Sequence, residues 1–212
     1  MKIIAALLLS FLICISMIAY TEENDTALDD IMEKYDKLGV SIERNKIEQI
    51  LKEHSFGHCK TNGELAAELL VRLGEGYYNY DTFEWTSLTD QLYAFDLEVF
   101  DISNMYTLFL QSIGSIVPDI EITGIKEDLS GLNDDLEGER SVSFLCNGHL
   151  YSFTLVGMHD WFDVDMLDYI RQVIHAENCP YELLYFYTIG QDVALYYGMQ
   201  EKGEQLEAFC NQ

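Results

Sequence analysis

Basic residues are scarce in this chain, which has 12 Lys and Arg against 37 Asp and Glu among 212 residues and a formal net charge of −25. A field of this sign repels nucleic-acid phosphates and anionic lipid headgroups, so it argues against nucleic-acid binding and against membrane binding through a basic patch. A cationic partner stays compatible with the charge. The acids also keep an aromatic-rich domain soluble, and we expect that simpler role for most of them.

Proline is almost absent, because Pro118 and Pro180 are the only two. No tract rich in Ser, Gly or Pro offers a flexible linker, and no fixed-period repeat divides the chain. With 49% hydrophobic and 13% aromatic residues, the chain can bury a sizeable core. We therefore predict one compact domain, in which a helical segment 20–88 packs with an α+β sheet segment 89–212.

The short motifs that hold phosphates, cofactors or catalytic metals are also missing. The sequence contains no GxGxxG, P-loop, HExxH or GxSxG motif, and no CxxC pair with the usual spacing of a structural zinc site. The acidic stretch 126–139 lacks the order D-x-D-x-D-G that arranges oxygen ligands around calcium in an EF-hand. We accordingly predict no cofactor and no metal site.

A long uncharged apolar run is present at the N-terminus. The segment Ile3–Ala19 follows Lys2 and precedes TEEND, a pattern that is typical of an export signal or a membrane anchor. The run is long for a cleavable signal and short for a membrane span, so residues 1–19 are a signal peptide or an uncleaved signal-anchor. In both cases we expect a secreted or anchored protein outside the cytoplasm, of bacterial type, with membrane contact only through residues 3–19 if they are retained.

Four cysteines follow this leader, namely Cys59, Cys146, Cys179 and Cys210. An even number in an exported chain permits two disulfide bonds, and three pairings are possible. The spacing of the cysteines does not choose among these pairings. Four thiols are too few for a disulfide-dominated scaffold in a domain of this size.

Helical spacing dominates the first part of the chain. Apolar residues recur on one stripe over residues 25–38, which predicts a first helix. Ser41 is expected to cap a second helix that reaches His54. A capping-box spacing beginning at Thr61 predicts the start of a third helix, which is expected to end at Gly74.

Apolar alternation and turn dipeptides dominate the second part. Asn147-Gly148 tolerates the two positive φ angles of a type I′ turn, so residues 141–146 and 149–156 should form a β-hairpin. A second hairpin is expected from residues 181–189 and 193–197.

Two further strands are expected at 92–100 and 120–125, with an acidic loop over 126–139. Three helices are expected in this part, beginning at Ser103, at Asp163 or Asp165, and at Glu201. The order predicts an α+β fold, with N-terminal helices packed against a mostly antiparallel five- to six-stranded sheet that carries helices on one face.

Aromatic residues provide the candidate binding surface. The loop 74–85 carries Tyr77, Tyr78 and Tyr80, and Trp161 lies in an acidic corner of the sequence. Tyr and Trp give large contact area with a polar tip, and a Trp beside carboxylates suits sugar hydroxyls or cations. The same rings can instead pack onto the core, which is the commoner arrangement and the one that we expect for the loop and for Trp161. We predict a non-catalytic binding or interaction domain for a protein or small-molecule ligand.

One thiol constellation supports an alternative, catalytic function. Cys59 precedes the predicted third helix, whose N-terminal dipole lowers the pKa of a nearby thiol. His149 begins a strand and Asp160 follows it, and this order is the one that papain-like and transglutaminase-like enzymes use for acyl transfer. A thiol acyl-transferase or peptidase requires the Cys59 sulfur within about 4 Å of a His149 ring nitrogen in an open cleft.

Overall fold

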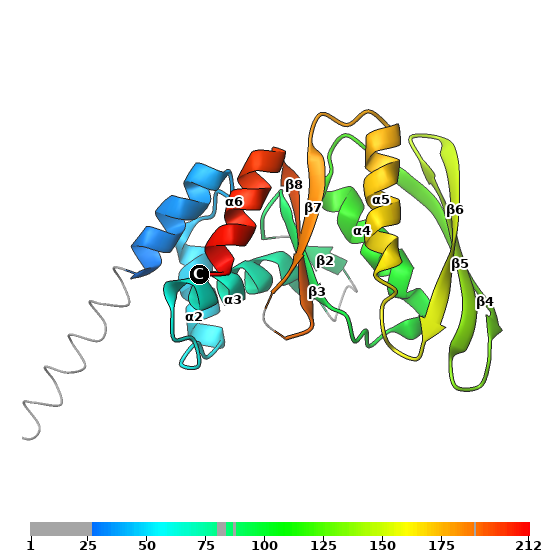
Figure 1. Ribbon diagram of the computed structural model, residues 1–212, viewed down its shortest axis with the longest axis horizontal. Helices are drawn as coiled ribbons and strands as arrows, with labels where there is room; N and C mark the ends of the chain where they lie inside the picture. Colours follow the sequence, from blue (N-terminus) through cyan, green and yellow to red (C-terminus); the bar gives the residue numbers. More distant parts are fainter. Residues whose placement is uncertain (1–26, 80–83, 87, 189) are drawn as a thin grey trace, which may run out of the picture.

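The computed structural model (Figure 1) describes residues 27–79, 84–86, 88–188 and 190–212. It describes the side chains of these residues except those between 77 and 87. The predicted leader Ile3–Ala19 lies outside the described residues, so export stays a prediction. Within the part of the chain that is described, no helix is both long and apolar enough to cross a membrane.

A central antiparallel sheet separates two hydrophobic cores. Its strands, in spatial order, are β3 (Leu92–Asp96), β8 (Asp192–Gly198) and β7 (Glu182–Tyr187). In β8, Ala194 and Tyr196 belong to one core, whereas Val193, Leu195 and Tyr197 belong to the other. The strand is therefore buried on both faces, and this explains why its sequence is almost continuously apolar.

The N-terminal helices and the C-terminal helix cover one face of this sheet (Figure 1). They are the helix of residues 27–38, α2 (Arg44–Glu53), α3 (Asn62–Glu75) and α6 (Gln200–Cys210). Gly74 does not end α3, as the sequence predicted, but lies inside it. A Cβ at Gly74 would lie 2.7 Å from atoms of Ala94, so the glycine lets α3 approach β3 closely. The helix ends instead at Gly76, which has a φ of 68°.

Of the three helix caps that the sequence predicted at Ser41, Thr61 and Ser103, only the one at Thr61 is confirmed. The capping box is present, because the Thr61 hydroxyl accepts the Glu64 N–H and the Glu64 carboxylate accepts the Thr61 N–H. Ser41 does not cap α2, which begins later in the chain. Ser103 lies within a short 3₁₀ turn, η1 (Ile102–Asn104), whose first turn is capped by Asp101.

Two helices cover the other face of the central sheet and also carry a second antiparallel sheet. The helices are α4 (Met105–Ile116) and α5 (Asp165–Ala176), and the second sheet has the order β4 (Ile122–Leu132), β5 (Glu137–Cys146) and β6 (His149–Met158). Along the long axis of the molecule, the layers are helices, sheet, helices and sheet (Figure 1). A short ribbon of β1 (Tyr77–Asn79) and β2 (Glu84–Thr86) forms a separate pair.

The predicted α+β class is confirmed, with six strands in the two larger antiparallel sheets of the described residues. These strands form two sheets and not one, because α4 and α5 lie between them and bury an apolar face on each side. For the same reason the central sheet carries helices on both of its faces, and not on one as the sequence predicted.

Both predicted hairpins are confirmed. Asn147 and Gly148 have φ angles of 50° and 85°, as a type I′ turn requires, and Cys146 pairs with His149. β7 and β8 form the second hairpin. The predicted acidic loop 126–139 is wrong, because β4 and β5 extend through most of it.

One half-buried carboxyl links the central sheet to the pH dependence of stability. Asp192 opens β8, and burial first, followed by the charges of Glu75 and Asp96, raises its pKa to about 6, against an opposing effect of Arg72. The folded state therefore binds the Asp192 proton more tightly than the unfolded chain. Ionisation of Asp192 in the folded state therefore costs stability. This cost grows as the pH rises from about 4 to about 6, and it is complete above that window.

We predict that Asp192→Asn raises the free energy of unfolding by about 1 kcal/mol at pH 7.5, a value discounted for the solvent that reaches this carboxyl. At pH 4 the variant and the parent should have the same stability. Thermal unfolding at both pH values measures the difference, and exposed Asp134→Asn serves as the control that should change neither. An equal shift of Asp192→Asn at both pH values would contradict the stated cause.

Candidate functional site: the open edge of the second sheet

The structure does not bring the three predicted triad residues together. Cys59 lies between α2 and α3, whereas His149 begins β6 in the layer at the opposite end of the molecule (Figure 1). Asp160 follows β6, so the length of a ten-residue strand, about 30 Å, separates it from His149 along the chain. The geometry therefore gives no support to a thiol acyl-transferase or peptidase.

The thiols of the described residues also lack activation. Cys59, Cys146, Cys179 and Cys210 are all free. Burial, together with the charges of nearby carboxylates, raises the pKa of Cys59 and of Cys179. Burial also raises the pKa of Cys146 and of Cys210 to about 12. A nucleophilic cysteine requires a lowered pKa, so the environment favours inert thiols.

Of the four aromatic residues predicted to bind a ligand, the structure describes the side chain of one, Trp161. Trp161 is 41% exposed, so the expected core position of this ring is wrong. The backbones of Tyr77 and Tyr78 belong to β1, but their side chains lie outside the described part, as does the whole of Tyr80. A binding role for these three tyrosines stays a prediction.

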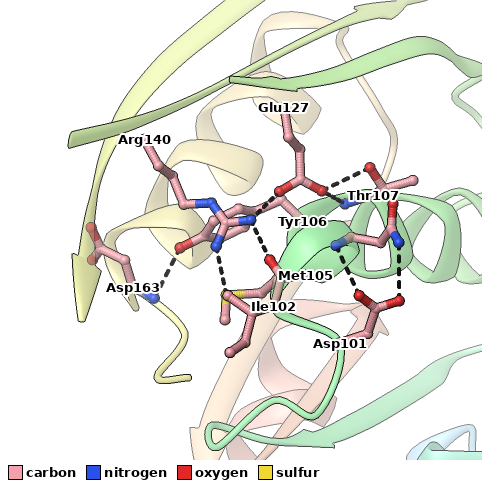
Figure 2. A network of polar contacts seen from close by, with 9 residues as sticks. Asp101, Ile102, Met105, Tyr106, Thr107, Glu127, Arg140 and Asp163 are labelled. Carbon is pink, nitrogen blue, oxygen red and sulfur yellow. Dashed lines mark hydrogen bonds and ion pairs between the residues drawn. The ribbon is translucent and has the colours of Figure 1, made fainter. Parts of the chain in front are cut away.

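A buried polar network joins α4 to the second sheet (Figure 2). Arg140 on β5 donates to the carboxylate of Glu127 on β4 and to the carbonyl of Ile102, at 2.6 Å from the latter. The side chains of Arg140 and Glu127 are only 2% and 5% exposed. The guanidinium carbon also lies 4.8 Å from the ring centre of Tyr106, a cation–π geometry.

This network caps both helices that lie between the sheets. The Glu127 carboxylate accepts the N–H and the hydroxyl of Thr107, each at 2.7 Å, in the first turn of α4. The Tyr106 hydroxyl accepts the Asp163 N–H at 3.1 Å, and Asp163 in turn accepts the N–H of Asp165 at the start of α5. The predicted acidic start of α5 is thus confirmed. Because the ion pair is sealed from solvent, its role is structural.

The two edge strands of the second sheet differ in their protection against further pairing. Exposed edges invite a new strand, and proteins usually blunt them with bulges or charges. β4 has register irregularities at Thr123/Lys126 and at Asp128/Gly131, and its exposed residues include charged side chains. β6 pairs in unbroken register with β5 and contains no Asp, Glu, Lys, Arg or Pro.

The type I′ turn determines which backbone groups of β6 face β5. In a two-residue hairpin, the flanking pair Cys146 and His149 exchanges both hydrogen bonds, and every second pair along the strands does the same. The N–H and C=O groups of Tyr151, Phe153 and Leu155 therefore point to β5. Those of the alternate residues point away from the sheet.

The outward-pointing backbone groups belong to Leu150, Ser152, Thr154 and Val156. The Val156 N–H donates to the Asp163 carboxylate at 2.7 Å, which agrees with this alternation. Among the described residues, no hydrogen-bond partner is present for the N–H and C=O groups of Leu150, Ser152 and Thr154. These three residues form the open part of the strand.

The side chains of the same residues lie on the outer face of the second sheet. Leu150 is 72% exposed and Val156 is 55% exposed, with the small polar residues Ser152 and Thr154 between them. We name the alternate residues 150, 152, 154, 156 and 158 the β6 edge. It combines the unpaired backbone groups of Leu150, Ser152 and Thr154 with exposed apolar side chains at Leu150 and Val156, a combination that suits strand addition.

The inner face of β6 is fixed on α5. His149 Nδ1 lies 3.0 Å from a carboxylate oxygen of Glu177, and the Tyr151 hydroxyl donates to the same oxygen at 2.6 Å. This hydrogen bond is the first cause that raises the pKa of Tyr151 to about 12 and lowers the pKa of Glu177. Phe153 stacks on Tyr169 with a centroid distance of 4.6 Å. The strand is therefore held in place before any partner arrives.

Sequence reasoning predicted the hairpin but missed the β6 edge and Glu177. The absence of charged residues and proline from 149–158 was a usable signal for an undefended strand. Glu177 gave no such signal, because its partners lie 26 and 28 residues away in the sequence.

Comparison with known proteins gives no further guidance, because no family model, curated protein or solved structure matches the chain. In the part of the chain that the structure describes, no group of three or more His, Cys, Asp or Glu residues is arranged to hold a metal ion. The β6 edge is thus the feature on which a functional proposal can rest.

The buried ion pair makes a prediction about stability. Arg140→Met leaves the Glu127 carboxylate buried without its cation, and we expect a loss of about 3–5 kcal/mol in the free energy of unfolding. The double variant Glu127→Gln/Arg140→Met retains a polar cap for α4 without a buried charge, so its loss should be smaller than that of Arg140→Met alone. Urea unfolding measures both variants. A double variant that loses as much stability as Arg140→Met alone, or more, would contradict the stated cost of an unpaired buried carboxylate.

Proposed function

We propose that this protein is a non-catalytic binding domain, located outside the cytoplasm, that recognises an extended polypeptide segment by adding it as a strand to the β6 edge. The observation that carries the proposal is the open backbone of Leu150, Ser152 and Thr154 on a strand without Asp, Glu, Lys, Arg or Pro. In strand addition, main-chain hydrogen bonds supply affinity and alternate side chains supply specificity.

The exposed side chains agree with this mode of binding. A strand paired with β6 would place alternate residues beside Leu150 and Val156 and remove apolar surface from water. Leu145 lies directly across from Leu150 on β5 and is 36% exposed, so the apolar surface continues onto the neighbouring strand. The fixed inner face of β6 lowers the entropy that is lost when a partner orders the edge.

The location outside the cytoplasm is part of the proposal and is supported by the sequence of the leader. The strongly anionic composition fits a secreted or anchored protein that must stay soluble without partners. We do not assign a catalytic role to Cys59, His149 and Asp160, because they do not form a common site.

The proposal predicts that a backbone change on the β6 edge weakens peptide binding. Ten-residue peptides would be selected from a random display library against the parent protein, and their affinities measured by titration calorimetry. Thr154→Pro removes an outward N–H and places a ring in the path of an added strand, so affinity should fall at least tenfold.

Thr154→Val is the matched control, because it keeps the N–H and changes only the side chain. It should bind the same peptides within about threefold of the parent. Circular dichroism verifies that both variants are folded. Failure to select any peptide, or equal binding by Thr154→Pro and Thr154→Val, would contradict the proposal.

A further inference from the structure

A row of side chains continues the outer face beyond the end of β6. Met158 pairs with Glu137 on one side and with Trp161 on the other, and Trp161 pairs in turn with Glu98. Residues that pair directly in antiparallel strands project from the same face. The row therefore reads Glu137, Met158, Trp161 and Glu98, with a carboxylate at each end and the indole between them.

A tight turn presents the indole at the end of the β6 edge. His159 has a positive φ of 59°, and the Trp161 N–H donates to the Met158 carbonyl at 3.1 Å. The chain thus reverses after β6 and returns along it as far as Asp163, whose carboxylate accepts the Val156 N–H. An added strand running past Thr154 would end against this returning segment, which carries Trp161 beside Met158.

The charge around this row is negative. Between residues 127 and 170 the sequence contains a single Lys or Arg, Arg140, which is 2% exposed and paired with Glu127. The Glu137 carboxylate lies 3.2 Å from Nε2 of His159. The Glu98 carboxylate accepts a hydrogen bond from the side-chain amide of Gln191 at 3.0 Å. An exposed indole flanked by carboxylates is the chemistry that binds an ammonium or guanidinium group.

A second copy of the chain is the poorer occupant of the same surface. Two chains of charge −25 repel each other, and self-pairing supplies no Lys or Arg from β6 itself. A basic segment is attracted by the same field and finds carboxylates at the end of the edge.

We infer that the segment added to the β6 edge is basic, and that one of its Lys or Arg side chains lies over Trp161 between Glu137 and Glu98. This inference rests on the proposed strand addition and specifies its partner. The apolar residues of the segment cover Leu150 and Val156, and its cation provides selectivity at one end.

Three acetylated and amidated peptides test the inference, namely KTVTVTVK, QTVTVTVQ and ETVTVTVE. The lysine peptide should bind the parent protein about tenfold more tightly than the glutamine peptide, and the glutamate peptide should bind least. In the double variant Glu98→Gln/Glu137→Gln, the preference for lysine should fall to about twofold, while the affinity for the glutamine peptide stays unchanged.

Glu207→Gln/Glu182→Gln is the matched control, because it removes the same charge from α6 and β7 and should keep the tenfold preference. Equal binding of the lysine and glutamine peptides would contradict the inference that the partner is basic. It would leave the proposal of strand addition intact. Absence of binding by all three peptides, together with a dimer in sedimentation that Thr154→Pro dissociates, would overturn the inference in favour of a second copy. Absence of both binding and dimer would count against strand addition itself.

Discussion

The burial of β8 on both faces is the constraint on which the rest of the structure depends. One strand supplies Ala194 and Tyr196 to the first core and Val193, Leu195 and Tyr197 to the second. The second core contains α4 and α5, which expose another apolar side and so require a second sheet to cover it. Among the described elements, helices cover only the inner face of that sheet. Its outer face is left to solvent, and so is the outer edge of β6 from Leu150 to Thr154.

Polar chemistry in this molecule serves mainly to hold these layers together. The Arg140–Glu127 pair caps α4 from a neighbouring strand, and Glu177 fixes the start of β6 on α5. The four described thiols are free, and partial or full burial raises the pKa of each. The groups that remain available to a partner are backbone amides and carbonyls on an uncharged strand, which favours recognition of a polypeptide chain over covalent chemistry.

Local signals in the sequence predicted much of this fold. The Asn147-Gly148 turn and the Thr61 capping box depend only on neighbouring residues, and both were correct. Glu127 was assigned to a loop because its acidic surroundings hid the alternation, and its buried position depends on Arg140, 13 residues away. The exposure of Trp161 was not predicted, because a tryptophan at a strand-to-helix corner is more often a core anchor. The β6 edge was missed, because the order of strands in a sheet is decided by the packing of whole layers.

The central claim is that β6 has an open outer edge, and amide hydrogen exchange resolved by NMR tests it without any ligand. The account predicts slow exchange at Tyr151, Phe153 and Leu155, whose amides pair with β5, and rapid exchange at Leu150, Ser152 and Thr154. Protection that alternates in this way along one strand would show that one side is paired and the other is free. Equal protection of all six amides would contradict the account, because it would mean that the edge is already covered.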